Sequence, residues 1–275
     1  KKTIFVAAVL AVLLAVCVVV DMTLPSYHIV VTVIKKATVY SLVAVSMNLL
    51  NGFTGLFSLG QAGFMLLGAY SYGVLTIPVA KRAGVYQYFD GGAIQFSLPE
   101  IFSGALGDTV GTVVGMLAAL LVGGILAALL AYLIGLPVLR LKSDYLAIAT
   151  LGFAEIIRAI FQWQALGPIT NGANMITQIP TFNNFNITDS SGKVVLYLSS
   201  FFPMLIMIIC VAIIVMLINS SYGRAFKAIR DDEVAAEAMG ISLFKHKMLS
   251  FVISSFFSGV GGALFAMYVS NAQAK

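Results

Sequence analysis

Charged residues are scarce in this chain, and their scarcity excludes most classes of protein. They form 10% of the 275 residues, whereas hydrophobic residues form 60%, and the mean hydropathy is +1.00. A soluble domain carries about 25% charged residues. The composition therefore excludes a soluble domain, a disordered chain and a disulfide-rich secreted module. It predicts an all-α, polytopic bundle of transmembrane helices.

Cysteine and histidine are equally rare, which removes most catalytic and metal-binding chemistry. Cys17 and Cys210 each lie in the middle of an apolar run, and the two histidines are far apart in the sequence. The sequence has no H-E-x-x-H motif, no phosphate-binding glycine loop and no Ser-His-Asp candidate. We therefore predict no catalytic residue, metal or cofactor in this chain. If the protein moves a solute uphill, the energy comes from elsewhere.

Long apolar runs are what the chain has in abundance. A helix needs about 20 apolar residues to cross the hydrocarbon core of a bilayer. Clear runs of this kind cover residues 4–20, 109–136, 197–218 and 248–269. Residues 29–80 are also apolar, but Asn, Gly, Ser and Gln interrupt them. We expect a broken or re-entrant segment near residues 50–65 that lies in the protein interior, because non-helical backbone cannot face lipid.

The run at residues 145–163 carries two charged residues, Glu155 and Arg158. Each costs about 2.5–3.5 kcal/mol at the centre of a span, whereas each Leu, Ile or Phe returns only about 0.3–0.6 kcal/mol. This helix therefore cannot face lipid alone. We still expect it to cross, because crossing places Arg140 and Lys142 on the same side as the basic loop at residues 219–247.

The resulting topology is a single transmembrane domain over residues 1–275 with about seven spans and a cytoplasmic N-terminus. The expected outer loops cover residues 21–28, 81–108 and 164–196, and the C-terminus faces outward. Lys81 and Arg82 in an outer loop run against the positive-inside rule. The 16 basic and 11 acidic residues are otherwise distributed as in a membrane protein, and no nucleic-acid partner is expected.

Two groups of polar residues inside the membrane are candidates for the translocation pathway. Asn48, Asn51 and Gln61 cluster at the broken segment, where transporters often expose helix ends to substrate. Local capping of a re-entrant turn is the alternative, and Gln61 is the first choice for a pathway residue. Glu155 and Arg158 lie on one helical face. Intramembrane ionisable residues are costly and usually functional; the alternative is an ion pair between helices that locks the bundle.

Small residues recur at every fourth position around one apolar run. They are Gly107, Gly111, Gly115, Ala119, Gly123, Ala127, Ala131 and Gly135. Small side chains let helix backbones approach closely, so we predict tight helix packing, with a surface that slides during conformational change as the alternative. Four residues turn a helix by about 400°, so the stripe drifts by about 40° per step. One straight partner helix cannot follow all of it.

The cytoplasmic loop at residues 221–242 contains a compact helix signal. Asp231 suits an N-cap and Gly240 suits a left-handed C-terminal stop, which predicts a short helix over residues 232–239. So short a helix is marginal in water and needs a partner. By pattern alone, a docking helix and an ordinary structured loop are equally compatible with this segment.

Three sequence blocks carry a resemblance to a known family. Residues 48–70 read NLLNGFTGLFSLGQAGFMLLGAY, residues 139–158 read LRLKSDYLAIATLGFAEIIR, and residues 223–241 read GRAFKAIRDDEVAAEAMGI. Together with GPITNGAN at residues 167–174, these blocks resemble the membrane permease subunits of bacterial ABC importers for branched-chain amino acids. The resemblance covers nearly the whole chain.

The resemblance implies import of leucine, isoleucine and valine across the bacterial cytoplasmic membrane by alternating access. It also implies three kinds of protein partner: separate ATPase subunits that bind ATP and Mg, a second homologous permease subunit, and an extracytoplasmic substrate-binding protein. Membrane lipid is a further expected partner. Relatives of the family carry urea, amides, ribose or nucleosides. The alternatives from other classes are a stand-alone ion-coupled transporter with Glu155 as a relay, and a structural membrane protein.

The resemblance further implies that residues 221–242 dock onto the ATPase. The residues that match the coupling region are Arg224, Arg230, Asp232, Glu233, Ala235, Ala236, Glu237 and Gly240. The family motif reads E-A-A, three residues, then G, but here Val234 takes the acidic position, and either of the flanking acids Glu233 and Glu237 could take its role. Similar permeases continue past Lys275 with another glycine-rich helix, so we expect a truncated C-terminus.

Overall fold

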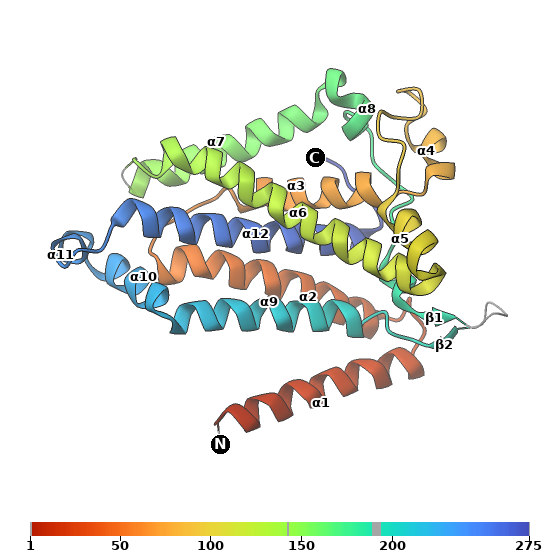
Figure 1. Cartoon of the computed structure of the whole chain (residues 1–275), viewed down its shortest axis with the longest axis horizontal. Helices are drawn as coiled ribbons and strands as arrows, with labels where there is room; N and C mark the ends of the chain where they lie inside the picture. The colour runs from red at the N-terminus through yellow and green to blue at the C-terminus, as the bar shows by residue number, and fades with distance from the viewer. Residues whose placement is uncertain (1, 142, 189–193, 275) are drawn as a thin grey trace.

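Long helices that run along one common axis build the molecule (Figure 1). The computed structural model describes residues 2–141, 143–188 and 194–274. The long helices are α1 (Lys2–Thr23), α2 (Ile29–Asn48), α3 (Gln61–Thr76), α6 (Asp108–Val138), α7 (Ser143–Gln162), α9 (Phe201–Asn219) and α12 (Leu243–Val269). The shorter helices are α4 (Val79–Val85), α5 (Leu98–Leu106), α8 (Gly167–Thr170), α10 (Ser221–Asp231) and α11 (Glu233–Ala238).

A few short elements complete the described chain. A π-helical turn, η1 (Leu49–Phe53), ends α2, and two 3₁₀ turns, η2 (Gln164–Leu166) and η3 (Phe182–Phe185), lie in the loop before α9. Strands β1 (Ile187–Thr188) and β2 (Val194–Leu196) pair antiparallel in the same loop. The prediction of an all-α bundle is confirmed for the membrane part, and this small hairpin is the exception.

Five of the described helices are long and apolar enough to cross a membrane. They are Ile29–Phe53, Asp108–Val138, Tyr145–Gln162, Phe201–Asn219 and Leu243–Val269. The polytopic character is thus confirmed, but the predicted number of about seven spans is not reached by length alone. Helix α3 has only 16 residues, because the break before it uses up the start of its apolar run. Helix α1 has 22 residues, and its stretch Val9–Thr23 is apolar.

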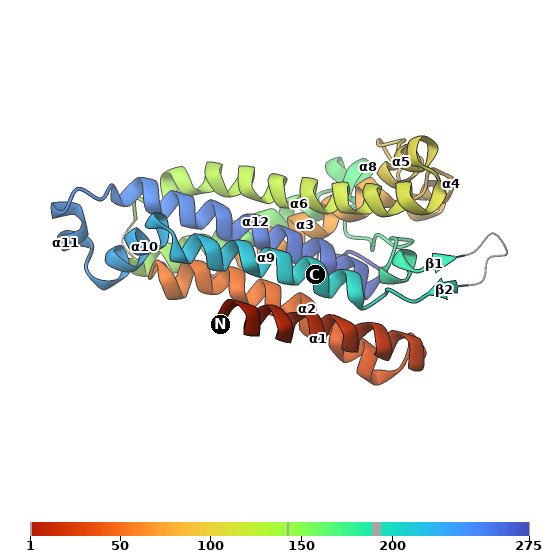
Figure 2. The same ribbon diagram turned by 60° about the horizontal axis from the view of Figure 1, so that its bottom comes forward.

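The loops gather at the two ends of the bundle (Figure 1 and Figure 2). Helices α10 and α11 lie at one end, together with the C-terminal end of α6. We call this the coupling end, after the coupling region that the resemblance implies for residues 221–242. Helices α4, α5 and α8 and the β1–β2 hairpin lie at the opposite end, which we call the cap end. The predicted topology places residues 81–108 and 164–196 on one side, and residues 81–108, 164–188 and 194–196 do lie together (Figure 1 and Figure 2).

Helix α12 is the centre of the bundle and packs against α2, α3 and α6. Its crossing with α3 needs glycine on both helices. A Cβ atom at Gly68 would overlap the backbone carbonyl of Gly259, and one at Gly262 would overlap the carbonyl of Met65. Close backbone approach through small residues is the usual way in which helices associate in a bilayer.

The small-residue stripe of α6 changes partner along its length. A Cβ at Gly111 or Gly115 would overlap the backbone of α5, Gly123 lies against Gly68 of α3, and Gly135 lies against Met248 of α12. These contacts confirm that one straight partner cannot follow the stripe. Gly107 is a correction, because it precedes α6 at φ +85° with no atom within 4 Å of its Cβ position, and so it contributes no packing.

Buried polar side chains hold the cap end together. Arg82 is 1% exposed and donates to the carbonyls of Val74, Ile94 and Phe96 at 2.6–2.7 Å. The guanidinium of Arg82 therefore has a structural role, because it satisfies three backbone acceptors. The Tyr86 hydroxyl donates to the carbonyl of Ile169 at 2.8 Å, and burial raises its pKa to about 12.

Candidate functional site

The segment at residues 221–242 forms two helices at the coupling end. Helix α10 buries Phe226 and Ile229 against the bundle. Asp232, in an extended conformation, caps α11 by accepting from the backbone N–H groups of Val234 and Ala235 at 2.9 and 3.0 Å. The predicted N-cap, Asp231, is wrong, because α10 extends through that residue and Asp231 pairs with Arg230 at 2.8 Å.

Gly240 ends α11 as the sequence predicted. Its φ is +85°, its N–H donates to the carbonyl of Glu237 at 2.9 Å, and the next N–H, from Ile241, donates to the carbonyl of Ala236 at 3.1 Å. This pair of bonds is a Schellman motif, in which a left-handed residue satisfies the last carbonyls of the helix. The helix is therefore closed at both ends without help from the rest of the chain.

Two apolar side chains on α11 and at its C-terminal cap are exposed. Val234 is 79% and Met239 is 84% exposed, whereas Ala236 is 4% exposed and packs against its own chain. Glu233 forms an ion pair with Lys247 at 2.7 Å. The side chain of Glu237 is exposed, and within the described ranges its carboxylate has no hydrogen bond or ion pair. Of the two candidate acids, it is therefore the one whose carboxylate has no partner among the described residues.

Helix α10 contacts the broken segment. Arg230 donates to the carbonyl of Gly52 in the π turn at 3.2 Å. Gly55 has a φ of +75°, and a Cβ there would lie 2.9 Å from Cγ of Arg230. The ammonium of Lys227 lies 5.7 Å from the ring centroid of Phe53. The structure thus brings together two sites that the sequence predicted separately, through a junction that no local pattern indicated.

The broken segment is held by local caps and by α7. The side-chain oxygen of Asn51 accepts from the N–H of Ser58 at 3.3 Å, and the N–H of Leu59 donates to the hydroxyl of Thr150 on α7 at 3.1 Å. Asn48 is exposed at the end of α2. In this conformation Asn51 therefore does what the capping alternative described, and its part in a pathway stays a prediction.

Gln61 is buried in a network of hydroxyl groups. Its side-chain nitrogen donates to Ser254 at 3.0 Å, and its oxygen accepts from Ser258, both on α12. Ser258 also bonds to the hydroxyl of Ser46 at 2.9 Å, and Ser254 donates to the carbonyl of Ser46 at 2.7 Å. The three serines are fully buried and Gln61 is 5% exposed. The network ties α2, α3 and α12 together at the start of α3.

Glu155 and Arg158 lie apart from this network. They form an ion pair of 2.7 Å within α7, and their side chains are 59% and 40% exposed. The pair therefore does not connect two helices of this chain, and it points away from the bundle. The opposite face of α7 carries the buried side chains of Leu146, Thr150 and Ile157.

Residues 29–275 of the chain match a family described as the permease component of branched-chain amino acid transport systems. The chain belongs to this family. The high-affinity branched-chain amino acid permease LivM of Escherichia coli K12 is 31% identical over 250 residues, which cover 83% of this chain and 50% of the relative. The permease therefore spans about half the length of that relative, and no solved structure matches it.

Two further relatives come from one organism, Methanocaldococcus jannaschii. Its probable branched-chain amino acid permease LivM is 26% identical to this permease, with 84% of the chain and 65% of the relative covered. Its probable permease LivH is 24% identical, with the same coverage. One organism thus has two separate permease proteins that are both similar to this chain.

The permease also buries two charged residues in α1 and α2 that sequence reasoning did not single out. Asp21 is 5% exposed and accepts from the backbone N–H and the hydroxyl of Ser200 at 2.5 and 2.7 Å. Lys35 is 7% exposed and lines a polar cavity of about 380 Å³ with Thr32 and Asn183. The signal that could have found them is a charged residue close to the junction of two apolar helices, at the end of α1 and in the first two turns of α2.

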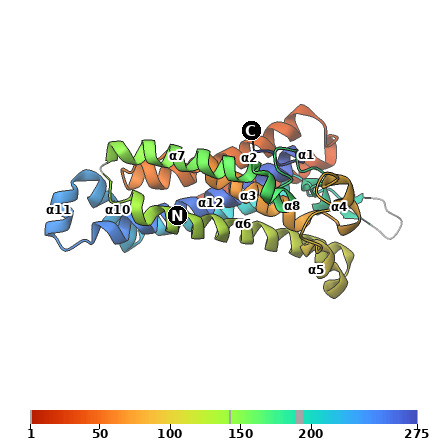
Figure 3. The same cartoon turned by 90° about the horizontal axis from the view of Figure 1, so that it is seen from above.

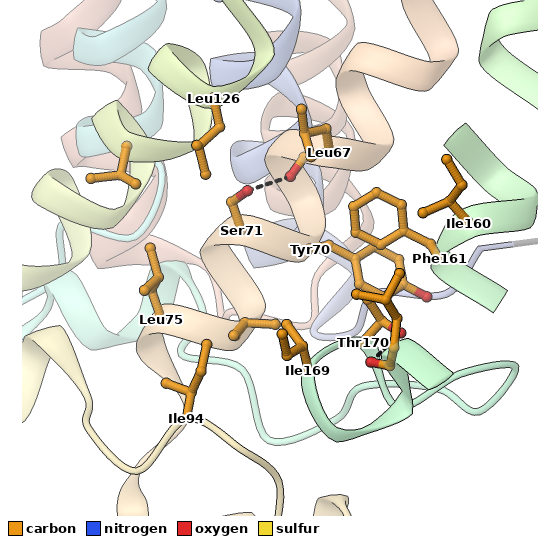
Figure 4. A pocket seen from close by; sticks show the side chains of 13 residues that line it. Leu67, Tyr70, Ser71, Leu75, Ile94, Leu126, Ile160, Phe161, Ile169 and Thr170 are labelled. Atoms are coloured by element: carbon orange, nitrogen blue, oxygen red, sulfur yellow. Dashed lines mark hydrogen bonds between the residues drawn. The ribbon is translucent and has the colours of Figure 1, made fainter. Parts of the chain in front are cut away.

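An apolar cavity of about 310 Å³ lies between α3, α6, α7 and α8 (Figure 4). Its polar lining residues are already engaged. Ser71 donates to the carbonyl of Leu67 at 2.7 Å, Thr170 donates to that of Leu166 at 3.1 Å, and the hydroxyl of Tyr70 accepts from the N–H of Ala274 at 2.8 Å. The cavity therefore offers a hydrocarbon wall but no charged group that could hold a zwitterion.

Proposed function

We propose that this permease is the transmembrane subunit of an ATP-driven importer for branched-chain amino acids, namely leucine, isoleucine and valine. It would work by alternating access in the bacterial cytoplasmic membrane, with its N-terminus and the coupling end in the cytoplasm. ATP and Mg would bind to separate ATPase subunits. The observation that carries the proposal is the junction in which Arg230 of the coupling end contacts Gly52 of the broken segment at 3.2 Å.

The junction supplies a physical route from a docked ATPase to the membrane interior. The exposed side chains of Val234 and Met239 form an apolar tip that a partner protein would cover. A ligand shifts a conformational equilibrium only through contacts that differ between the two states. Movement of α11 with the nucleotide state would move α10, and through Arg230 it would change the break that precedes Gln61.

The other partners follow from the relatives and from the two ends. The pair of similar permeases in one organism supports a second permease subunit. The cap end, which buried hydrogen bonds hold rigid, suits the docking of an extracytoplasmic substrate-binding protein. The names of the relatives support branched-chain amino acids as the substrate, and urea, amides, ribose and nucleosides are the alternatives. Asn48, Asn51, Gln61, Glu155 and Arg158 remain the candidate pathway residues.

Reconstitution into proteoliposomes tests this function. The chain would be combined with the ATPase subunits, the second permease and the substrate-binding protein, and uptake of labelled leucine and ATP hydrolysis would be measured together. We expect Arg230→Ala to reduce uptake about tenfold while basal ATP hydrolysis continues, because the contact to the break is lost. Arg140→Ala, an exposed arginine at the same end, is the matched control and should keep normal uptake.

Two results would contradict the proposal. Uptake by this chain alone under an ion gradient would show a secondary transporter instead of an ATP-driven one. Tight coupling of hydrolysis to uptake in the Arg230→Ala variant would show that the junction does not transmit the nucleotide state.

A further inference from the structure

The outward face of α7 is unlike the lipid-facing surface of a transmembrane helix. Glu155 is the eleventh of the 18 residues in the span Tyr145–Gln162, which places it about 15 Å from the start of the span at 1.5 Å per residue. Its ion pair with Arg158 leaves the two side chains 59% and 40% exposed. Helix α7 lies at the edge of the bundle (Figure 3), so nothing within the described residues covers this pair.

Contact with lipid is energetically unfavourable for the Glu155–Arg158 pair. A charged side chain at the centre of a span costs about 2.5–3.5 kcal/mol on insertion scales, and such groups almost always face protein or a water-filled cavity. The short side chain of Glu155 cannot reach an interface from mid-span. Pairing with Arg158 cancels the net charge, but the exposed oxygen and N–H atoms still need hydrogen-bond partners that hydrocarbon does not provide.

The same face has room for another helix backbone. Gly152 and Ala159 are both exposed, and no atom lies within 4 Å of a Cβ placed at Gly152. They are seven residues apart, which is about two turns, and so they lie above and below Glu155 on one side of α7. Ile148, which is 70% exposed, continues this line. Small residues around a polar group are typical of helix contacts within membranes.

We propose that the outward face of α7, formed by Ile148, Gly152, Glu155 and Ala159, is the contact surface for a transmembrane helix of the second permease subunit. The inference rests on the proposed function, because it assumes a pair of permeases. The occupant must lie at mid-membrane depth, where ATPase subunits and substrate-binding proteins do not reach. It must also offer polar groups to the Glu155–Arg158 pair, which a lipid tail cannot do.

The surface also has a mechanical consequence. On its inner side α7 holds the broken segment through the bond from Leu59 to Thr150, 3.1 Å long. Helix α7 would then lie between the partner permease and the break of its own chain. A rearrangement of the two permeases would then displace the broken segment through α7, in addition to any displacement through the Arg230 junction at the coupling end.

Photo-crosslinking in the assembled importer tests the surface. Single cysteines would be introduced as Gly152→Cys or Ala159→Cys in a Cys17→Ala, Cys210→Ala background, labelled with benzophenone maleimide in the membrane, and irradiated. We expect an adduct with the second permease subunit, identified by mass spectrometry. Ile213→Cys on α9, which is 50% exposed in a strongly apolar helix, is the control and should give lipid adducts only.

A bulky substitution gives an independent readout. Gly152→Trp should reduce the amount of second permease that co-purifies with this chain about tenfold, while the chain itself stays in the membrane at the wild-type level. Adducts to lipid alone at positions 152 and 159, or an adduct within the same chain, would overturn the assignment, as would normal co-purification of the Gly152→Trp variant.

The experiments distinguish an error in the proposed α7 contact surface from an error in the proposed function. If the wild-type chain co-purifies with ATPases and a second permease and supports uptake, but positions 152 and 159 give no permease adduct, only the surface is wrong. If the wild-type chain co-purifies with no such subunits, the proposed function itself is wrong.

Discussion

The permease has two polar clusters at membrane depth, and they face opposite ways. The cluster around Gln61 lies between α2, α3 and α12, where every hydroxyl has a partner within the chain. The Glu155–Arg158 pair lies on the outer side of α7 and stays half exposed. In the most apolar 18-residue stretch of α12, 72% of the stretch is buried, whereas only 22% of the corresponding stretch of α7 is buried. The first cluster therefore stabilises this chain, whereas the second is available for contact with the proposed second permease subunit.

The largest expected effect comes from forcing α3 and α12 apart. In Gly68→Ala, the added methyl group would overlap the carbonyl of Gly259, and overpacking of this kind costs about 1–3 kcal/mol, occasionally more. We expect a loss of about 3 kcal/mol in the free energy of unfolding, measured by SDS titration in mixed micelles. Gly152→Ala, where the methyl group meets no atom, should unfold like the wild type. Equal stability of the two variants would contradict a rigid α3–α12 contact.

Removal of the buried amide should have the next largest effect. Gln61→Ala leaves a cavity and removes two hydrogen bonds to α12, which together cost about 2 kcal/mol. The same SDS titration measures this loss. Gln95→Ala, at an exposed amide of the cap end, is the control and should change stability by less than about 0.5 kcal/mol. A Gln61→Ala variant of full stability would mean that the network is dispensable.

The outer cluster should behave in the opposite way. Glu155→Ala should leave the unfolding free energy of the isolated chain unchanged to within about 1 kcal/mol, because the pair lies within one helix and such intrahelical pairs contribute only about 0.2–0.5 kcal/mol. In the assembled importer the same variant should reduce uptake several-fold, since an unpaired Arg158 at an interface is costly. The double variant Glu155→Gln, Arg158→Gln should recover part of the uptake. A large stability loss in the isolated chain would place the pair inside the fold.

At the coupling end we expect an effect on stability that is smaller than those of Gly68→Ala and Gln61→Ala. Gly240→Ala forces a side chain into a φ of +85° and should cost about 1 kcal/mol, whereas Gly84→Ala, which meets no atom, should cost nothing. Gly240→Pro also removes the N–H that bonds to Glu237 and should uncouple ATP hydrolysis from uptake. A bulky residue at the buried Ala236 should do the same. Normal substrate-stimulated turnover in both variants would exclude a coupling role for α11.

Hydropathy and helix-end chemistry predict much of this structure from the sequence. The apolar run expected at residues 248–269 lies within α12, Leu243–Val269, and the short helix expected at residues 232–239 is α11, Glu233–Ala238. These features are local, because a cap or a run of apolar residues depends on a few neighbouring positions. The error at Asp231 has the same origin, since two adjacent aspartates carry equal capping signals and only the extent of α10 distinguishes them.

Contacts between distant segments could not be predicted in the same way. Gln61 is bonded to Ser254 and Ser258, which lie 193 and 197 residues away in the sequence, and its part in a pathway stays a prediction. The junction between Arg230 and Gly52 joins positions separated by 178 residues. No pattern of period 3.6 contains such information, because it marks which face of a helix is apolar and not which helix that face will meet.

The sequence by itself determined that this protein resides in a membrane, because 10% charged residues cannot cover a soluble surface. It also determined which residues are costly there, since the price of Glu155 or Gln61 in hydrocarbon depends on side-chain chemistry alone. Only the tertiary structure decided how each is satisfied. Because α3 packs on α12, Gln61 faces its own chain. Because α7 lies at the edge of the bundle, Glu155 faces outward.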